Sequence, residues 1–179
     1  YVDGDKGILR YRGYDIEILT ENCDFLEVAF LLLYGELPNK LQLEKWSNSI
    51  MTHTYVHEDL KDLLKCFRYD AHPMGMLISS LAAISTFYPE ENPALNGLDI
   101  YNNKDICNKQ INRIIGKVTT LAAWAYRHRL GRPYNYPKNG LSYIENFLFM
   151  LDYLNQENYI PDKIIVDTLN KIFILHADH

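Results

Sequence analysis

Apolar residues recur every three or four positions over most of the chain, which is the spacing of one face of an α-helix. Residues 1–14 differ, because short apolar and aromatic stretches alternate there with Asp-Gly and Lys-Gly turn pairs. The sequence therefore predicts an all-α fold class, multi-helical, with a short N-terminal β-hairpin. The predicted helices span residues 24–35, 41–51, 57–67, 74–87, 105–130, 141–154 and 162–175.

Several helix ends carry local start and stop signals. Asp24 and Glu27 have the spacing of a capping box, and Gly35 is placed to end the same helix. Pro73 and the Pro161–Asp162 pair are typical of first turns, where a missing N–H costs nothing. Residues 89–103 are polar and contain Pro and Gly, so they predict a connection between two helices.

Two segments, 74–87 and 110–126, are too apolar on all sides for surface helices and are rich in small residues. One interpretation makes them central core helices. The other makes them helices that pack against copies of themselves, since an obligate interface resembles a domain core cut in half. The pattern leaves both interpretations open.

Composition narrows the class of protein. The 179 residues are 47% hydrophobic and 23% charged, as in ordinary globular proteins. The formal net charge is −5, with no basic stripe, which disfavours nucleic-acid binding. No apolar run reaches the roughly 18 residues that a membrane helix needs. The three cysteines, Cys23, Cys66 and Cys107, have no paired spacing and indicate a reducing compartment.

His176 and His179 are the most suggestive polar residues, because a spacing of three places both rings on one side of a helix end. They could hold a metal, although zinc requires three or four ligands. They could instead bond only to backbone carbonyls. As a third possibility, their N–H groups could donate to the carboxylates or carbonyl of an anionic substrate.

Weaker candidates have simpler interpretations. Aspartates beside tight turns commonly bond local backbone, and basic residues on the long helix are expected on a solvated face or near its C-terminal dipole. No phosphate-binding glycine loop and no nucleophile elbow occur. These candidates are Asp3, Asp5, Asp15, His53, His57, His72, Arg113, Lys117, Arg127, His128 and Arg129.

The chain resembles citrate synthases over nearly its whole length. Residues 2–14 are similar to the family's "DG..GIL.YRGY" opening, and residues 27–38 to its "EVA.LLLYGELP" stretch. Four more motifs follow in the family's order, at residues 70–74, 131–133, 141–148 and 175–179. The stretch 87–101 is most similar to the peroxisomal and related bacterial branch.

The resemblance implies a largely helical homodimer whose residues 1–179 form the amino-terminal part of the large domain, with the small domain and the carboxy-terminal part absent. It implies condensation of oxaloacetate with acetyl-CoA to citrate and CoA, at the start of the tricarboxylic acid cycle. Acetyl-CoA is then a substrate, and no cofactor or metal is expected. The dimer would form through helices 74–87 and 110–126, with neither nucleic acid nor membrane as a partner.

The resemblance also assigns site residues. His179 matches a histidine that contacts oxaloacetate, and His176 matches its supporting neighbour. No catalytic residue of the family falls in this chain, so the chain alone is expected to be inactive. Two alternatives stay open, a 2-methylcitrate synthase and a non-catalytic dimerisation scaffold. The mitochondrial matrix is the favoured location, with the peroxisome and the bacterial cytoplasm as alternatives.

Overall fold

The computed structural model describes residues 1–178. The chain divides into two compact units. The first contains residues 1–48, 143–145 and 160–179, and the second contains residues 49–142 and 146–159. Two helices contribute to both units, α3 (Lys40–Thr52) and α8 (Tyr143–Asp152).

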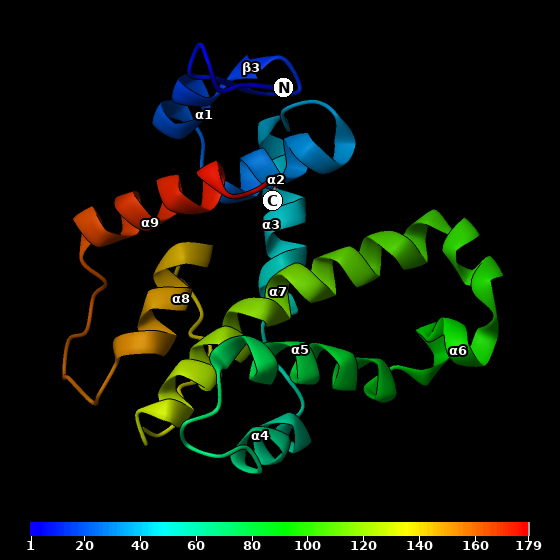
Figure 1. Ribbon diagram of the computed structural model, residues 1–179, viewed down its shortest axis with the longest axis vertical. Coiled ribbons are helices and arrows are strands. Elements are labelled where there is room, and N and C mark those ends of the chain that lie inside the picture. The colour runs from blue at the N-terminus through cyan, green and yellow to red at the C-terminus, as the bar shows by residue number, and fades with distance from the viewer. Residues whose placement is uncertain (179) are drawn as a thin grey trace. The chain divides into compact units, whose positions relative to one another are not determined.

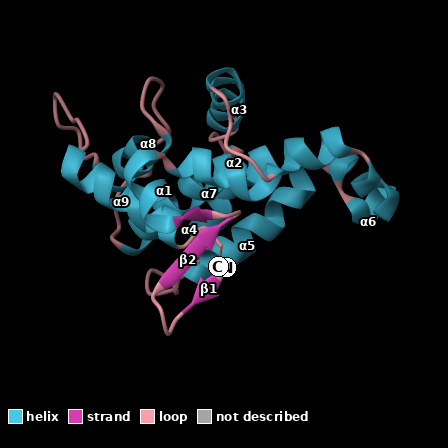
Figure 2. Cartoon of the chain, turned by 90° about the horizontal axis from the view of Figure 1, so that it is seen from above, coloured by secondary structure: helices cyan, strands magenta, loops and turns pink. Residues whose placement is uncertain are grey.

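The first unit begins with a small antiparallel sheet of order β1-β2-β3, drawn in magenta in Figure 2. The strands are β1 (Val2–Asp3), β2 (Ile8–Tyr11) and β3 (Tyr14–Asp15). The two-residue turn between β2 and β3 has positive φ at both Arg12 (50°) and Gly13 (95°), as such tight hairpin turns require. The predicted N-terminal hairpin is therefore present, and a short third strand extends it.

Helices α1 (Ile16–Asn22) and α2 (Phe25–Tyr34) follow the sheet. In α2 the predicted capping box is present, because Asp24 accepts from the N–H of Glu27 and Glu27 accepts from the N–H of Asp24. Gly35 closes this helix in the left-handed region, with φ 92°. Helix α1 was not predicted from the sequence, because it has no side-chain cap and buries only Leu19.

Helix α9 (Lys163–Leu175) packs against α1 and α2 in the first unit. The core there is a cluster of fully or nearly fully buried side chains from the sheet and three helices. None of these side chains is charged. Its members are Tyr11, Leu19, Val28, Leu31 and Ile174. The end of α9 is thus held in the core of this unit by Ile174.

The second unit is built around α7 (Lys104–Arg129), which runs back alongside α5 (Pro73–Ile84) in the opposite direction (Figure 1). Helix α4 (Glu58–Lys65) packs on both. The buried side chains of this cluster are Leu60, Leu64, Met76, Ile84, Leu121, Trp124 and Ala125. The predicted helix 74–87 ends three residues early as an α-helix and continues as a 3₁₀ turn, η1 (Ser85–Phe87).

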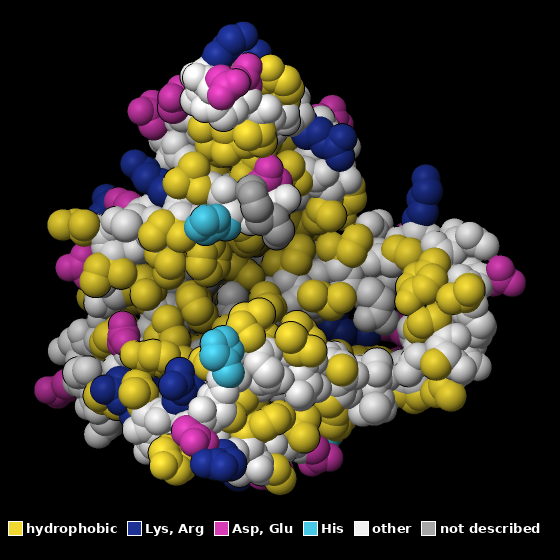
Figure 3. Space-filling model, in the orientation of Figure 1, with side chains coloured by type: hydrophobic (Ala, Val, Ile, Leu, Met, Phe, Trp, Pro, Cys, Tyr) yellow, Lys and Arg dark blue, Asp and Glu magenta, His cyan; other side chains and the backbone are white. Residues whose placement is uncertain are grey.

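Residues 89–103 connect η1 to α7, as the sequence predicted, but they are not without structure of their own. They form three short helical segments, η2 (Pro89–Glu91), α6 (Pro93–Asn96) and η3 (Leu98–Asn102). One of the polar residues caps α6, since Asn92 accepts from the N–H of Ala94. Apolar side chains gather around α6 on the face seen in Figure 3. Leu95 of α6 and Leu98 of η3 are both exposed.

No helix within residues 1–178 is both long enough and apolar enough to cross a membrane.

Candidate functional site

The predicted histidine pair lies at the end of α9. Asp162 starts this helix as predicted, because its carboxylate accepts hydrogen bonds from the backbone N–H groups of Ile164 and Ile165. His176 ends it, and its own backbone N–H donates to the carbonyl of Ile172 at 3.2 Å. The His176 side chain is exposed to solvent. His179 lies outside the described residues, so its place relative to His176 stays a prediction.

Tyr11 ties the sheet to the segment that follows α9. Its side chain is only 2% exposed, and its hydroxyl lies 2.9 Å from Oδ1 of Asp178 and 3.1 Å from the carbonyl oxygen of Leu175. Burial, followed by the hydrogen bond to Asp178, raises the pKa of Tyr11 above that of a free tyrosine. The hydroxyl therefore keeps its proton and remains a donor at any physiological pH.

Asn170 makes a second tie, in the middle of α9. Its Oδ1 accepts from the N–H of Phe25 at 2.8 Å, and its Nδ2 donates to the carbonyl of Cys23 at 3.3 Å. Both bonds are made at the junction of α1 and α2, where backbone groups lack helical partners. Helix α9 is thus fixed at its middle by Asn170 and at its end by Tyr11.

Metal binding was one interpretation of the histidine pair. Among residues 1–178, no three or more His, Cys, Asp or Glu side chains are grouped so that they could hold a metal ion. The described part of the site consists instead of an exposed imidazole, a carboxylate held by a tyrosine, and a helix end. Of these groups, only the imidazole can donate an N–H to a polar ligand.

Three other histidines have local structural partners. Nδ1 of His57 accepts from the N–H of Asp59, and Nδ1 of His72 accepts from the N–H of Met74, each at 3.2 Å. Both rings therefore cap helices. Nδ1 of His53 lies 2.6 Å from the carbonyl of Ser49. His53 and His57 lie on opposite sides of the junction between α3 and α4, so they share no helix face.

The prediction that the turn aspartates bond local backbone is confirmed at Asp3 and wrong at Asp15, whose carboxylate bonds the Arg10 side chain. Oδ1 of Asp3 accepts from the N–H of Lys6 at 3.2 Å, within the turn between β1 and β2. Asp15 forms an exposed ion pair with Arg10 of the neighbouring strand, which contributes little to stability. Neither carboxylate is part of a larger group of catalytic side chains in the described residues.

The predicted solvated face of α7 is wrong at Arg113 and Lys117, which are buried. The Arg113 side chain, 4% exposed, pairs with Glu91 and lies over the Tyr88 ring, 3.4 Å from its centroid. Lys117 donates to the carbonyls of Tyr55 and His53. Burial, and then the charge of Arg113, lowers the pKa of Lys117 to about 8. Both cations are thus part of the interior of the second unit.

Arg127 is also buried, although its position predicted a helix-dipole partner at the end of α7. Its guanidinium donates to the carbonyls of Pro133 and Leu151, the latter at 2.8 Å. Leu151 belongs to the last turn of α8, so Arg127 satisfies carbonyls at the C-terminus of a different helix. Burial lowers the pKa of Arg127.

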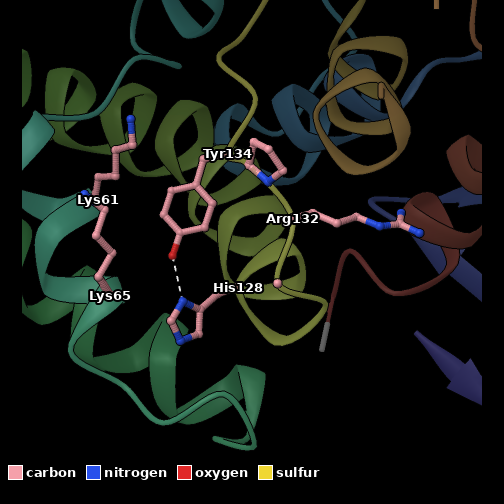
Figure 4. Close-up of a pocket in the computed structure, with 7 residues that line it drawn as sticks. Lys61, Lys65, His128, Arg132 and Tyr134 are labelled. Atoms are coloured by element: carbon pink, nitrogen blue, oxygen red, sulfur yellow. Dashed lines mark hydrogen bonds between the residues drawn. The ribbon is translucent and has the colours of Figure 1, made fainter. Parts of the chain in front are cut away.

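A cavity of about 440 Å³ lies beside His128 and Tyr134 (Figure 4). His128 is fixed there, since Nε2 donates to the carbonyl of Phe67 at 2.9 Å and Nδ1 faces the Tyr134 hydroxyl at 2.8 Å.

Lys61 and Lys65 line the cavity but have partners of their own, Tyr136 and Asp62. Arg132 extends away from Tyr134. The cations therefore do not converge on one ligand position.

The whole chain, residues 1–179, matches the family model described as "Citrate synthase, C-terminal domain". The chain belongs to the citrate synthase family. It is 63% identical over all 179 residues to "Citrate synthase" and to "Citrate synthase, peroxisomal" of Dictyostelium discoideum, covering 35% and 36% of their lengths. It is 50% identical to "Citrate synthase, glyoxysomal" of Cucurbita maxima, covering 35%. The chain thus spans about a third of the length of these relatives.

Solved citrate synthases share the fold. The enzyme from Pyrobaculum aerophilum superposes with a TM-score of 0.84 and 31% identity, over 97% of this chain and 42% of that one. The Thermoplasma acidophilum citrate synthase, in a ternary complex with carboxymethyl coenzyme A and oxaloacetate, gives 0.83 and 26%, over 100% and 44%. The predicted family, its peroxisomal branch and the largely helical fold class are confirmed.

Sequence reasoning missed Tyr11, Asn170 and Glu91 as residues that organise the two units. The nearest signal for Tyr11 was its place in a predicted strand, which says nothing about a partner 167 residues away. Asn170 lies inside a predicted helix, where a half-buried amide has no local signature.

Proposed function

We propose that the full-length protein is a citrate synthase, which condenses oxaloacetate with acetyl-CoA and releases citrate and CoA. The identity of 63% to two citrate synthases over all 179 residues carries this proposal. The Thermoplasma relative, solved with carboxymethyl coenzyme A and oxaloacetate, supports the same pair of substrates. We also propose that residues 1–179 form the amino-terminal part of the large domain.

Within this chain, the proposed substrate contacts are His179 and His176. An imidazole N–H at position 179 would donate to an oxaloacetate oxygen, and His176 would support it from the helix end. The reaction also needs a base that removes a proton from the acetyl methyl group, and donors that stabilise the enol. The fixed end of α9 is the part of the structure that supports this assignment.

The activity is tested with the full-length protein and a thiol reagent that detects free CoA. We expect CoA release from acetyl-CoA only in the presence of oxaloacetate, at least tenfold faster than from propionyl-CoA. Faster turnover of propionyl-CoA would make the protein a 2-methylcitrate synthase. Absence of oxaloacetate-dependent release from both thioesters would refute the proposal and favour a scaffold role.

We propose in addition that the protein is a homodimer through α5 and α7. Both helices keep an uncovered apolar stripe at helical spacing. On α5 the exposed stripe contains Met74, Gly75, Ile78, Ser79 and Ala82, and on α7 the exposed or half-buried stripe contains Ile114, Val118, Ala122 and Tyr126. Ile78 is 61% exposed and Ile114 49% exposed. Small residues between the large ones would let the helices of two subunits approach closely.

Ile78→Arg is expected to weaken the dimer at least a hundredfold, because a charge would be buried in the centre of the apolar interface. Light scattering after size-exclusion chromatography, over a range of protein concentrations, measures this change. Ile160→Arg is the matched control, since Ile160 is 80% exposed and lies in the first unit. An Ile78→Arg protein that stays dimeric at nanomolar concentration would place the interface elsewhere.

For location we propose the peroxisome rather than the mitochondrial matrix that the sequence favoured. Three relatives, at 63%, 50% and 42% identity over the whole chain, are named as peroxisomal or glyoxysomal citrate synthases. Imaging of the tagged full-length protein together with peroxisomal and mitochondrial markers distinguishes the two compartments.

A further inference from the structure

We propose that one end of the α5–α7 hairpin docks on a second copy of this chain, in a cavity at the other end of that copy's hairpin. The docking element is residues 93–102, which contain α6 and η3 and are here called the hairpin tip. The proposal rests on the proposed homodimer through α5 and α7. It adds to that dimer a second contact, which a two-fold axis makes twice.

The hairpin tip presents large apolar side chains to solvent. Leu95, Leu98 and Tyr101 are 69%, 76% and 56% exposed. The backbone beneath them is held in place, because α6 packs on η3, η3 packs on α7, and Glu91 just before the tip pairs with Arg113. A fixed group of exposed apolar side chains is typical of a surface that contacts another protein.

A cavity of about 390 Å³ opens at the other end of the hairpin, beside the last turn of α7. Tyr126 lines this cavity and also belongs to the apolar stripe of α7, so the cavity is continuous with the proposed dimer interface. The two tyrosine rings and the leucine around the cavity are all exposed, so an apolar side chain entering from outside would cover them. The lining residues are Tyr69, Asp70, Tyr126, Arg129 and Leu130.

Two-fold symmetry can bring the tip and the cavity together. Helix α7 has 26 residues and is about 39 Å long, with the hairpin tip at its start and the cavity at its end (Figure 1). The stripe from Ile114 to Tyr126 begins near the middle of this helix. A two-fold axis that crosses α7 at right angles near its middle exchanges the two ends. The tip of each subunit then lies over the cavity of the other, and the two copies of α7 run antiparallel, as their dipoles favour.

The charges at the two ends favour this pairing over contact between two tips. Asp99 is exposed in the tip, and Arg129 is exposed beside the cavity. Asp70 pairs with Arg68, whereas neither Asp99 nor Arg129 forms an ion pair within the part of the chain that the structure describes. Docking of the tip on the cavity places Asp99 near the Arg129 position of the other subunit. Contact between two tips would bring Asp99 close to its own copy, which costs free energy.

The apolar stripe alone is small for a stable dimer. Its large side chains, Met74, Ile78, Ile114 and Tyr126, are each about half exposed. They therefore offer roughly 100 Å² each, against roughly 800 Å² per partner in a standard interface. The hairpin tip and the cavity supply further large apolar side chains at the two ends of the stripe, which brings the contact closer to that size.

Leu98→Asp in the full-length protein is expected to raise the dissociation constant of the dimer at least tenfold, because a charge replaces the most exposed apolar side chain of the tip. Analytical ultracentrifugation over a range of protein concentrations measures this change. The subunit should still fold, since Leu98 lies at its surface. Leu41→Asp is the matched control, because Leu41 is 60% exposed and lies in the first unit. A Leu98→Asp dimer as tight as the original would overturn the proposal.

A charge exchange tests which surface the tip meets. Asp99→Arg and Arg129→Asp are each expected to weaken the dimer about fivefold, because each leaves two like charges facing one another across the contact. The double variant restores an opposite pair, so its dissociation constant should lie within twofold of the original. Single effects that multiply in the double variant would contradict contact between the tip and the cavity.

Cross-linking tests the same contact directly. Leu98→Cys and Leu130→Cys are made as separate proteins in a Cys66→Ser background, because Cys66 is exposed. With a short bismaleimide, a mixture of the two proteins should give cross-linked dimers after subunit exchange, and neither protein alone should do so. Cross-linking of the Leu98→Cys protein alone would show contact between two tips and overturn the proposal.

The outcomes separate this contact from the proposed dimer. A full-length protein that is monomeric overturns both the dimer and the docking of the tip. A dimer that Ile78→Arg disrupts, but that Leu98→Asp and the two single charge variants leave intact, overturns the docking of the tip alone.

Discussion

Gly116→Ala is expected to lower the free energy of unfolding by about 3 kcal/mol, the upper end of what overpacking usually costs. A Cβ at position 116 would lie 2.6 Å from the carbonyl oxygen of Ile50 and 2.9 Å from the carbonyl carbon of His53. Both are backbone atoms, so no side-chain rotation can relieve the contact. Helix α7 passes the end of α3 at this point, and only glycine permits the approach.

Helix propensity alone predicts the opposite sign, because alanine is favoured over glycine inside a helix by about 1 kcal/mol. Lys45, exposed in α3, provides the control. There the Ala variant should be more stable than the Gly variant by about that amount. Denaturant unfolding of the original protein, Gly116→Ala, Lys45→Ala and Lys45→Gly measures both differences in unfolding free energy. A Gly116→Ala protein as stable as the original would show that α7 and α3 can separate at little cost.

Glu91→Gln is expected to lower the free energy of unfolding by about 3 kcal/mol or more, which is the range for removing one partner of a buried ion pair. The Glu91 side chain is 6% exposed and accepts hydrogen bonds from Lys109, Gln110 and Arg113. Glutamine keeps the shape and removes the charge, so the buried guanidinium of Arg113 loses the carboxylate that neutralises it. The segment from η2 to η3 should also loosen from α7, since Glu91 is its anchor.

Glu90→Gln is the control for this variant, because Glu90 is adjacent in sequence and exposed. Its unfolding free energy should stay within about 0.5 kcal/mol of the original, as for most surface substitutions. Replacing Glu91 and Arg113 together by Leu and Met should recover much of the loss, since a buried pair is often replaceable by apolar residues. A double variant less stable than Glu91→Gln would contradict this account.

The contribution of Glu91 to the stability of the fold is expected to decrease at acidic pH. Burial works to raise its pKa, but the hydrogen bonds from Lys109 and Arg113 outweigh burial and hold the pKa below the usual 4.5. A carboxyl group with a lowered pKa in the folded state stabilises the fold above its unfolded pKa. That stabilisation is lost as the pH falls from 4.5 through the lowered value. The difference between Glu91→Gln and the original protein should therefore shrink in this acidic range.

Local chemistry explains which elements the sequence could predict. The start of α2 was predicted because Asp24 and Glu27 satisfy each other's backbone N–H groups within four residues. The end of the same helix was predicted because Gly35 adopts a positive φ at no steric cost. The short helical turns within the connection 89–103 were not predicted, since Asn92 can cap a helix or start a loop and its own neighbours do not distinguish the two.

The residues of the candidate site also divide into those that the sequence could predict and those that it could not. The pair of histidines at a helix end could be found from spacing, and Asp162 correctly marked where that helix begins. Tyr11 could not be found, because its partner Asp178 is far away in sequence and the burial that makes the bond strong exists only after folding. The same holds for Arg113 and Lys117, which look like surface cations on a helix. Glu91 and Tyr88 cover Arg113, and the carbonyls of His53 and Tyr55 accept from Lys117.

The sequence by itself therefore determined the helical class, most helix boundaries and the family. These follow from periodicity, caps and motifs, which act over a few residues. Only the tertiary structure decided which cations are buried, why residue 116 must be glycine, and how the end of α9 is held by Tyr11. Those features depend on atoms from distant segments that meet in a low-dielectric interior. The spacing of residues along the chain predicts neither which side chains form pairs nor which are buried.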